Sequence, residues 1–319
     1  MECLITNLYF DPPIPCRGDI LGRNYQTHIN KVSIQVYFPT LKLRQNNNTV
    51  DLQIEKPEVY DLTKVNDWGY VSIHNTEHPE NLEKIGVLIN QVVIVLNTND
   101  TDFNDVLNSV CNDINEWRAQ LYERIILLGK SITSNNDLFS CEHEVISFDL
   151  YKPNDYSKIR LNSAIGFKAK LNYINNYLSD CDIEKLLKDI DTSKKIKMEY
   201  KYFLNALIQF DQGNTRYAIL EATTACELCI THIIHVHCEK IGINGAGLCD
   251  QFYRSLGDRF NLLKYLGIEL ITPNPDKKIT KPRNDLIHNR KLIPTNEECL
   301  EVLNEVKQYL NAYIPDMYE

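Results

Sequence analysis

The segment GVLINQVVIVL, residues 86–96, is a long apolar run with only two polar interruptions, and it predicts a strand at the centre of a sheet. Residues 31–38 (KVSIQVYF) and 49–55 (TVDLQIE) alternate apolar and polar positions, as strands with one buried face do. Residues 70–74 (YVSIH) give a weaker strand pattern. The first part of the chain is therefore predicted to contain a sheet.

The hydrophobic period changes after about residue 100. Between residues 100 and 128 apolar side chains recur every three or four positions, which predicts one long helix that Asp100 or Thr101 can cap. Residues 144–150 (EVISFDL) return to a strand pattern. Residues 1–178 are therefore expected to form an α+β domain of unassigned fold, in which a long helix covers a sheet.

Almost everything after about residue 165 has the period of helices. Thr295 and Glu298 form a capping box that opens the last helix. Before it, helices are predicted over residues 199–210, 215–240, 248–266 and 282–290. Residues 179–319 are therefore expected to form an all-α helical bundle.

The bulk composition restricts what these two domains can be. Of 319 residues 43% are apolar and 24% charged, and the formal net charge is -9, so the surface as a whole is not suited to gripping nucleic acid. We find no run of about 18 apolar residues and no basic, cleavable leader, so no membrane span and no export are expected. The ten cysteines are then expected to be reduced thiols of a cytoplasmic protein.

The chemistry of the C-terminal part is concentrated in residues 277–291, KKITKPRNDLIHNRK. Pro282 suits the first turn of a helix, so Arg283 is expected beside the free amides of a helix N-terminus, where phosphate is favoured. Arg283 can bind phosphate through its charged fork, and His288 can transfer protons near neutral pH. Asn284 lies four residues before His288 and shares its helix face. We predict Arg283, Asn284 and His288 as catalytic residues.

The same segment is locally basic. Residues 276–291 contain six lysines or arginines and two aspartates, which is a charge of +4 within a chain of -9. A basic strip on an acidic body is typical of a surface that binds a phosphate backbone. The predicted RNA-binding residues are Lys278, Lys281, Arg290 and Lys291.

The Arg-Asn-x-x-x-His pattern, with two apolar residues before the histidine, resembles the Arg-x4-6-His motif of HEPN domains (higher eukaryotes and prokaryotes nucleotide-binding). The resemblance covers about residues 180–319. It implies an endoribonuclease without metal or cofactor, in which the RNA 2′-hydroxyl attacks phosphorus and leaves a 2′,3′-cyclic phosphate and a 5′-hydroxyl. It also implies a homodimer through the C-terminal bundle. The layout resembles bacterial toxins and anti-phage proteins, whose N-terminal domain would meet a trigger ligand or protein.

A different class of function stays open, namely an inactive HEPN-like scaffold that binds a nucleotide or a partner and cuts nothing. Arg23 and His28 also match the motif, but they lie just before a strand pattern, and we interpret them as a coincidence. Tyr309 and Tyr313 on the last helix could stack on bases, although core packing is the simpler expectation.

The sequence CELCITHIIHVHC, which begins at Cys226, contains side chains that bind zinc. Only Cys226, Cys229 and His237 share a helix face, and that face is apolar, so we predict a core helix and no metal site. Glu221 and Glu227 on this helix could reach the catalytic histidine, but solvent exposure is the simpler expectation.

Overall fold

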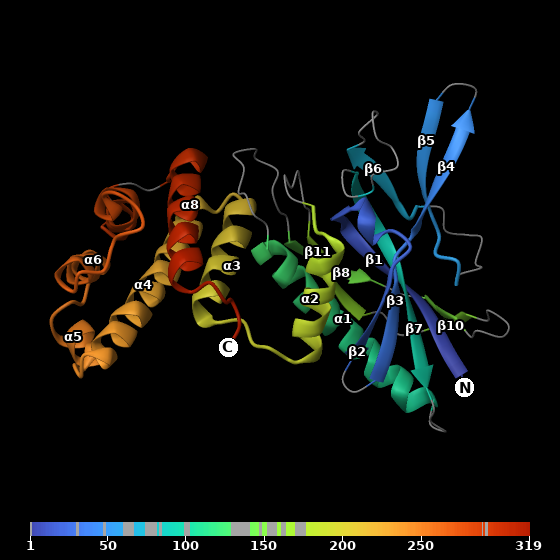
Figure 1. Ribbon diagram of the computed structural model, residues 1–319, viewed down its shortest axis with the longest axis horizontal. Coiled ribbons are helices and arrows are strands. Elements are labelled where there is room, and N and C mark those ends of the chain that lie inside the picture. Colours follow the sequence, from blue (N-terminus) through green and yellow to red (C-terminus); the bar gives the residue numbers. More distant parts are fainter. Residues whose placement is uncertain are drawn as a thin grey trace. The chain divides into compact units, whose positions relative to one another are not determined.

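The computed structural model describes residues 2–29, 32–46, 49–59, 67–73, 82, 85–98, 103–128, 141–146, 149–151, 158–160, 164–169, 177–288, 290 and 293–319. They form two compact units, of which the first continues to Ser193 and the second covers the described residues from Lys194 onward. Figure 1 shows the strands in the first unit and helices in the second. The coarse prediction of an α+β region followed by a helical region is confirmed.

Strand β7 (Gly86–Thr98) is the centre of an antiparallel sheet. It pairs with β1 (Glu2–Arg17) on one side and with β3 (Val32–Tyr37) on the other, while β6 (Gly69–Ile73) pairs with its first residues. The strand order is β10-β9-β1-β7-β3-β2, with β2 at Asn24–Ile29, β9 at Asp149–Tyr151 and β10 at Lys158–Arg160. The predicted central strand is confirmed, because its apolar side chains from Val87 to Leu96 are almost all fully buried.

Two further strand pairs complete the described β structure. The hairpin of β4 (Thr40–Asn46) and β5 (Thr49–Glu55) forms one pair, and β8 (Cys141–Ile146) with β11 (Ala164–Ala169) forms the other. The prediction of helix from about residue 165 onward is wrong at its start, because β11 lies there. Strands β1, β2, β4 and β10 had no counterpart among the predicted elements.

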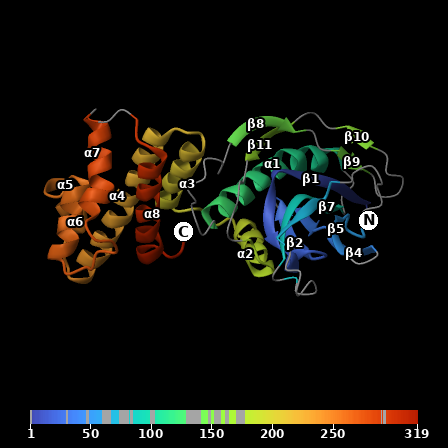
Figure 2. The same cartoon turned by 90° about the horizontal axis from the view of Figure 1, so that it is seen from above.

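Helix α1 (Phe103–Leu128) lies against one face of the sheet, as Figure 2 shows. Its stripe of Ile114, Trp117, Leu121 and Ile125 is buried, as the period predicted. Tyr122 meets Phe10 of β1 edge to face, at 5.8 Å between ring centroids. The predicted caps Asp100 and Thr101 lie outside the described residues.

Helix α2 (Asp180–Asp191) belongs to the first unit and not, as the predicted boundary at 178/179 implied, to the helical bundle. Its first residue, Asp180, accepts a hydrogen bond from Tyr25 of β2. Its last residue, Asp191, accepts hydrogen bonds from the Thr27 hydroxyl at 2.5 Å and from the His28 amide at 2.6 Å. Both ends of α2 are therefore attached to one edge strand.

The second Arg-x4-His match takes part in the same attachment. The Arg23 Nε lies 3.7 Å from an Asp180 oxygen, and the His28 Nδ1 lies 3.4 Å from an Asp191 oxygen. Both side chains thus contact α2, which gives the pair a structural role and agrees with its interpretation as a coincidental match.

We predict that a fragment ending at residue 193 unfolds cooperatively and that one ending at 178 is far less stable. The shorter fragment lacks α2, so the surface that buries four apolar side chains of this helix becomes exposed. We expect its free energy of unfolding to be lower by about 6 kcal/mol or more. Urea unfolding of both fragments, followed by circular dichroism, measures the difference. Equal stability would show that α2 is not part of this unit. The four side chains are Ile183, Leu186, Leu187 and Ile190.

Helix α4 (Thr215–Lys240) is the central helix of the second unit. Its small residues Ala218, Ala222 and Ala225 are fully buried, and they allow α3 (Met198–Asp211) and α8 (Asn296–Tyr313) to pack closely on either side. The capping box predicted at Thr295 and Glu298 is present at the start of α8. The remaining elements are α5 (Gly245–Gln251), α6 (Leu256–Tyr265), the π-helical turn η3 (Asp276–Thr280) and α7 (Lys281–Ile287).

The prediction of one helix over residues 248–266 is wrong. The chain leaves α5 at Phe252, whose side chain is 70% exposed, and starts again at Ser255. Ser255 and Asp258 form a capping box, which satisfies the free amides of a new helix N-terminus. Two short helices therefore replace the predicted long one.

Within the described residues, α4 is long and apolar enough to cross a bilayer, with a mean hydropathy of 1.3 over its most apolar window. The sequence had suggested no such segment. In the structure α3, α5, α6 and α8 pack against this helix, and 44% of that window is buried.

Candidate functional site

Helix α7, which carries the motif, continues directly from η3. Thr280 has helical backbone angles (φ −69°, ψ −44°), and the Lys281 amide donates to the Asp276 carbonyl, so the chain does not leave the helix before Pro282. The free amides of this helical segment lie near Asp276. The prediction that Arg283 sits beside a helix N-terminus is therefore wrong.

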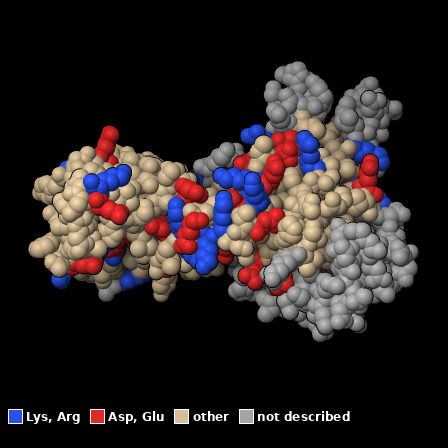
Figure 3. All heavy atoms as spheres, turned by 60° about the horizontal axis from the view of Figure 1, so that its bottom comes forward, with Lys and Arg blue, Asp and Glu red and all other residues tan. Residues whose placement is uncertain are grey.

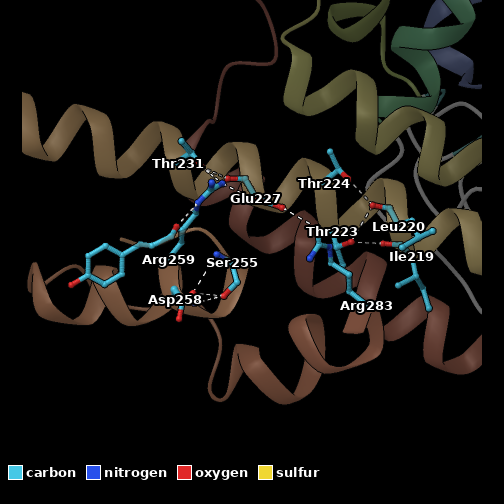
Figure 4. Close-up of polar contacts among 11 residues, drawn as sticks. Ile219, Leu220, Thr223, Thr224, Glu227, Thr231, Ser255, Asp258, Arg259 and Arg283 are labelled. Carbon is cyan, nitrogen blue, oxygen red and sulfur yellow. Dashed lines mark hydrogen bonds and ion pairs between the residues drawn. The ribbon is translucent and has the colours of Figure 1, made fainter. Parts of the chain in front are cut away.

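Arg283 is held by an acidic residue of α4 instead. Its Nη2 lies 3.4 Å from one oxygen of Glu227, and Nη1 of Arg259 on α6 lies 2.9 Å from the other oxygen. Figure 4 shows Glu227 between the two guanidinium groups. Arg259 also donates to the Tyr253 carbonyl and to the Thr231 hydroxyl. One carboxylate thus fixes two arginines, and the cluster of Glu227, Arg259 and Arg283 has a net charge of +1.

The predicted solvent exposure of Glu227 is wrong, since its side chain is only 20% exposed. Arg259 was not foreseen, because its partner lies on another helix. The alternative that Glu227 could reach the catalytic residues named the histidine, whereas its ion-pair partners are the arginines Arg259 and Arg283.

His288 is the C-cap residue that follows α7, and it is exposed. Its amide donates to the Asn284 carbonyl at 2.9 Å, which closes the last turn, and the half-buried Asn284 lies one turn before it. Arg216 of α4 donates to the Leu286 carbonyl at 3.1 Å, and the Leu286 side chain is buried. Helix α7 is therefore anchored to α4 at both ends, and its histidine remains accessible.

Two cations of the predicted basic strip, Lys278 and Arg283, are paired with acidic residues from other helices. Lys278 donates a hydrogen bond to Glu305 of α8, which raises the pKa of the lysine and holds it on the bundle. Arg290 lies 3.7 Å from Asp285. Lys281 is exposed, and Lys291 lies outside the described residues. In Figure 3 acidic and basic side chains are interspersed on the visible surface.

A cleft of about 320 Å³ opens beside α7. Its floor is apolar, with Ile219, Pro282, Leu286 and Pro294, and its rim has three lysines and three carboxylates. The charge of +4 that the sequence predicted for this region is therefore absent from the cleft itself, because the acidic residues of α8 face it. The rim residues are Lys277, Lys278, Lys281, Asp285, Glu298 and Glu301.

The other side chains considered from sequence belong mainly to the core. Tyr309 is fully buried, and its hydroxyl oxygen accepts a hydrogen bond from Thr272 at 3.3 Å, so the prediction of core packing is confirmed. Tyr313 is half-buried and donates to the Glu269 carbonyl. Cys226 and Cys229 are fully buried, and burial raises the pKa of Cys229 to about 12. A buried neutral thiol is a poor zinc ligand, since zinc binds the thiolate.

No known protein family matches the chain, and no curated protein or solved structure matches it either.

We predict that Glu227→Gln lowers the free energy of unfolding by about 1–3 kcal/mol, because two partly buried guanidinium groups lose their carboxylate. Urea titration of the full chain measures this, with Glu239→Gln at the exposed end of α4 as the control. A change no larger than that of the control would mean that Glu227 does not fix the two arginines.

Proposed function

We propose that the second unit is a metal-independent endoribonuclease of the HEPN type, with Arg283 and His288 as its catalytic residues. The observation that carries the proposal is the contrast between the two side chains on one short helix. Arg283 is fixed by Glu227, while His288 is exposed at the end of the same helix. A fixed cation and an accessible proton carrier are what this reaction requires from the protein.

The reaction uses the substrate's own nucleophile. The 2′-oxygen of RNA forms a bond to phosphorus as its proton leaves, and the bond from phosphorus to the 5′-oxygen breaks as that oxygen takes up a proton. Arg283 stabilises the charge that grows on the phosphate oxygens, and Glu227 keeps its guanidinium in place. His288 transfers one proton, and we propose that His288 of a second copy transfers the other in a homodimer. Asn284 is proposed to orient the phosphate.

The first unit is proposed to restrain this activity until it meets a trigger ligand or protein. Uncontrolled RNA cleavage would harm the cell that makes the enzyme. A cytoplasmic toxin or anti-phage effector would need such control. This part of the proposal rests on the layout of an α+β unit followed by a helical unit.

A binding scaffold that cuts nothing is the second candidate, and one observation favours it. Lys278, Arg283 and Arg290 each have a carboxylate partner within the chain, so these cations also serve the fold. A scaffold would keep such pairs without any need for the exposed His288.

Incubation of the purified protein with total RNA in EDTA separates the two candidates. We expect the wild type to cleave RNA and to leave ends with a 2′,3′-cyclic phosphate. Cleavage should fall about 100-fold or more in His288→Ala and in Arg283→Lys, because lysine keeps the positive charge but lacks the paired donors of the guanidinium group. His232→Ala, which removes an exposed histidine of α4, is the control and should cut normally.

Cleavage that persists in both site variants would contradict the site assignment. If no form cuts RNA even when the helical unit is freed of the first unit, the scaffold is the better description.

A further inference from the structure

The cleft beside α7 is lined by four residues of this helix, Lys281, Pro282, Asp285 and Leu286. Lys281, Asp285 and His288 are spaced by four and three residues, so they follow one helix face. Arg283 lies two residues after Lys281, about 200° around the helix. His288 is seven residues from Lys281, which is about 10 Å along the axis. The helix face that carries His288 therefore borders the cleft through Lys281 and Asp285.

The floor of the cleft suits a flat apolar group. Pro282, Leu286 and Pro294 come from both sides of the cleft, and Ile219 of α4 closes its base. The volume of about 320 Å³ is large enough for one nucleobase with its ribose. Proteins that read single-stranded RNA commonly take up an unstacked base in this way.

Two lysines on the rim are available for a phosphate. Lys278 is occupied by Glu305, whereas Lys277 and Lys281 are exposed and have no ion-pair partner within the described part of the chain. Lys277 was not among the predicted RNA-binding residues. Its position four residues before Lys281 brings both ammonium groups to the same rim.

The rim also has three carboxylates, Asp285 on α7 and Glu298 and Glu301 on α8, and a carboxylate without a strong partner can select among bases. Glu298 is engaged in the cap of α8, and Asp285 lies near Arg290. Glu301 is the least engaged, with its side chain 59% exposed and 4.0 Å from Lys278. A carboxylate accepts hydrogen bonds from the amino group of cytosine or adenine but repels the carbonyl oxygen that uracil presents at the same position.

We propose that this cleft binds a nucleobase of single-stranded RNA beside the helix face that carries His288, and that it prefers bases that carry an amino group. Lys277 and Lys281 hold the adjoining backbone, and Glu301 accepts from the amino group. The inference rests on the proposed function for its choice of RNA as ligand.

The test measures binding without cleavage. Short fluorescent oligocytidine and oligouridine are titrated into the full-length His288→Ala protein and followed by anisotropy, since the two bases share one ring and differ in the amino group. We expect oligocytidine to bind about tenfold more tightly. Glu301→Gln should remove the preference, whereas Glu297→Gln, an exposed residue outside the cleft, should keep it.

The lysines are tested in the same protein. Lys277→Ala with Lys281→Ala should weaken binding of both oligomers about tenfold and make it less sensitive to salt. Lys240→Ala with Lys264→Ala removes two exposed lysines of the same unit and is the matched control. Equal affinity for the two oligomers, or equal effects of the two lysine pairs, would overturn the proposal.

Failure of this inference and failure of the nuclease are distinguishable. Binding that depends on Lys277, Lys281 and Glu301 in a protein that cuts no RNA would uphold the cleft and reject the nuclease. If RNA cleavage depends on Arg283 and His288 but binding is unchanged in the cleft variants, the nuclease is upheld and the cleft proposal is rejected.

Discussion

The carboxylate of Glu227 is the constraint on which the helical unit's candidate site depends. It is mostly buried on the central helix and is shared between guanidinium groups from two other helices. A carboxylate in such a position needs a cation, and each arginine needs the carboxylate, so α6 and α7 are tied to α4 through the same two oxygens. The position of Arg283 is thus a property of three helices rather than of the motif alone.

The parts of the fold that sequence predicted are those in which burial is periodic. Strand β7 and helices α1, α4 and α8 follow from their apolar spacing. Strand β1 was missed because Pro12, Pro13 and Pro15 interrupt its pattern. The structure accommodates Pro12 and Pro13 with a register shift between Tyr9 and Ile14, while Pro15 lies opposite Leu88 of β7. The break between α5 and α6 was visible in the capping box of Ser255, but the apolar period ran across it.

The candidate site was predictable in its residues and not in its electrostatics. Arg283, Asn284 and His288 do lie on one short helix with a buried anchor at Leu286. The local charge count failed because the neutralising carboxylate, Glu305, comes from a helix later in the chain. A sum over a segment cannot include side chains that only folding brings close. For the same reason the sequence did not indicate a role for Arg259, whose partner Glu227 lies on another helix.

The π-helical turn η3 affects the angle around the helix axis between the side chains that precede it and those of α7. A π turn accommodates more residues than an α turn over the same rise, so it sets the angular phase of every side chain that follows. Deleting one residue between Asp276 and Thr280 would let the turn relax to α geometry with little change in angular phase, because five residues of a π turn span nearly the same arc as four residues of an α-helix. The phase between the segments on either side of η3 therefore tolerates the loss of one residue in this turn, whereas a deletion within α7 itself would rotate the side chains before it by about 100° relative to those after it.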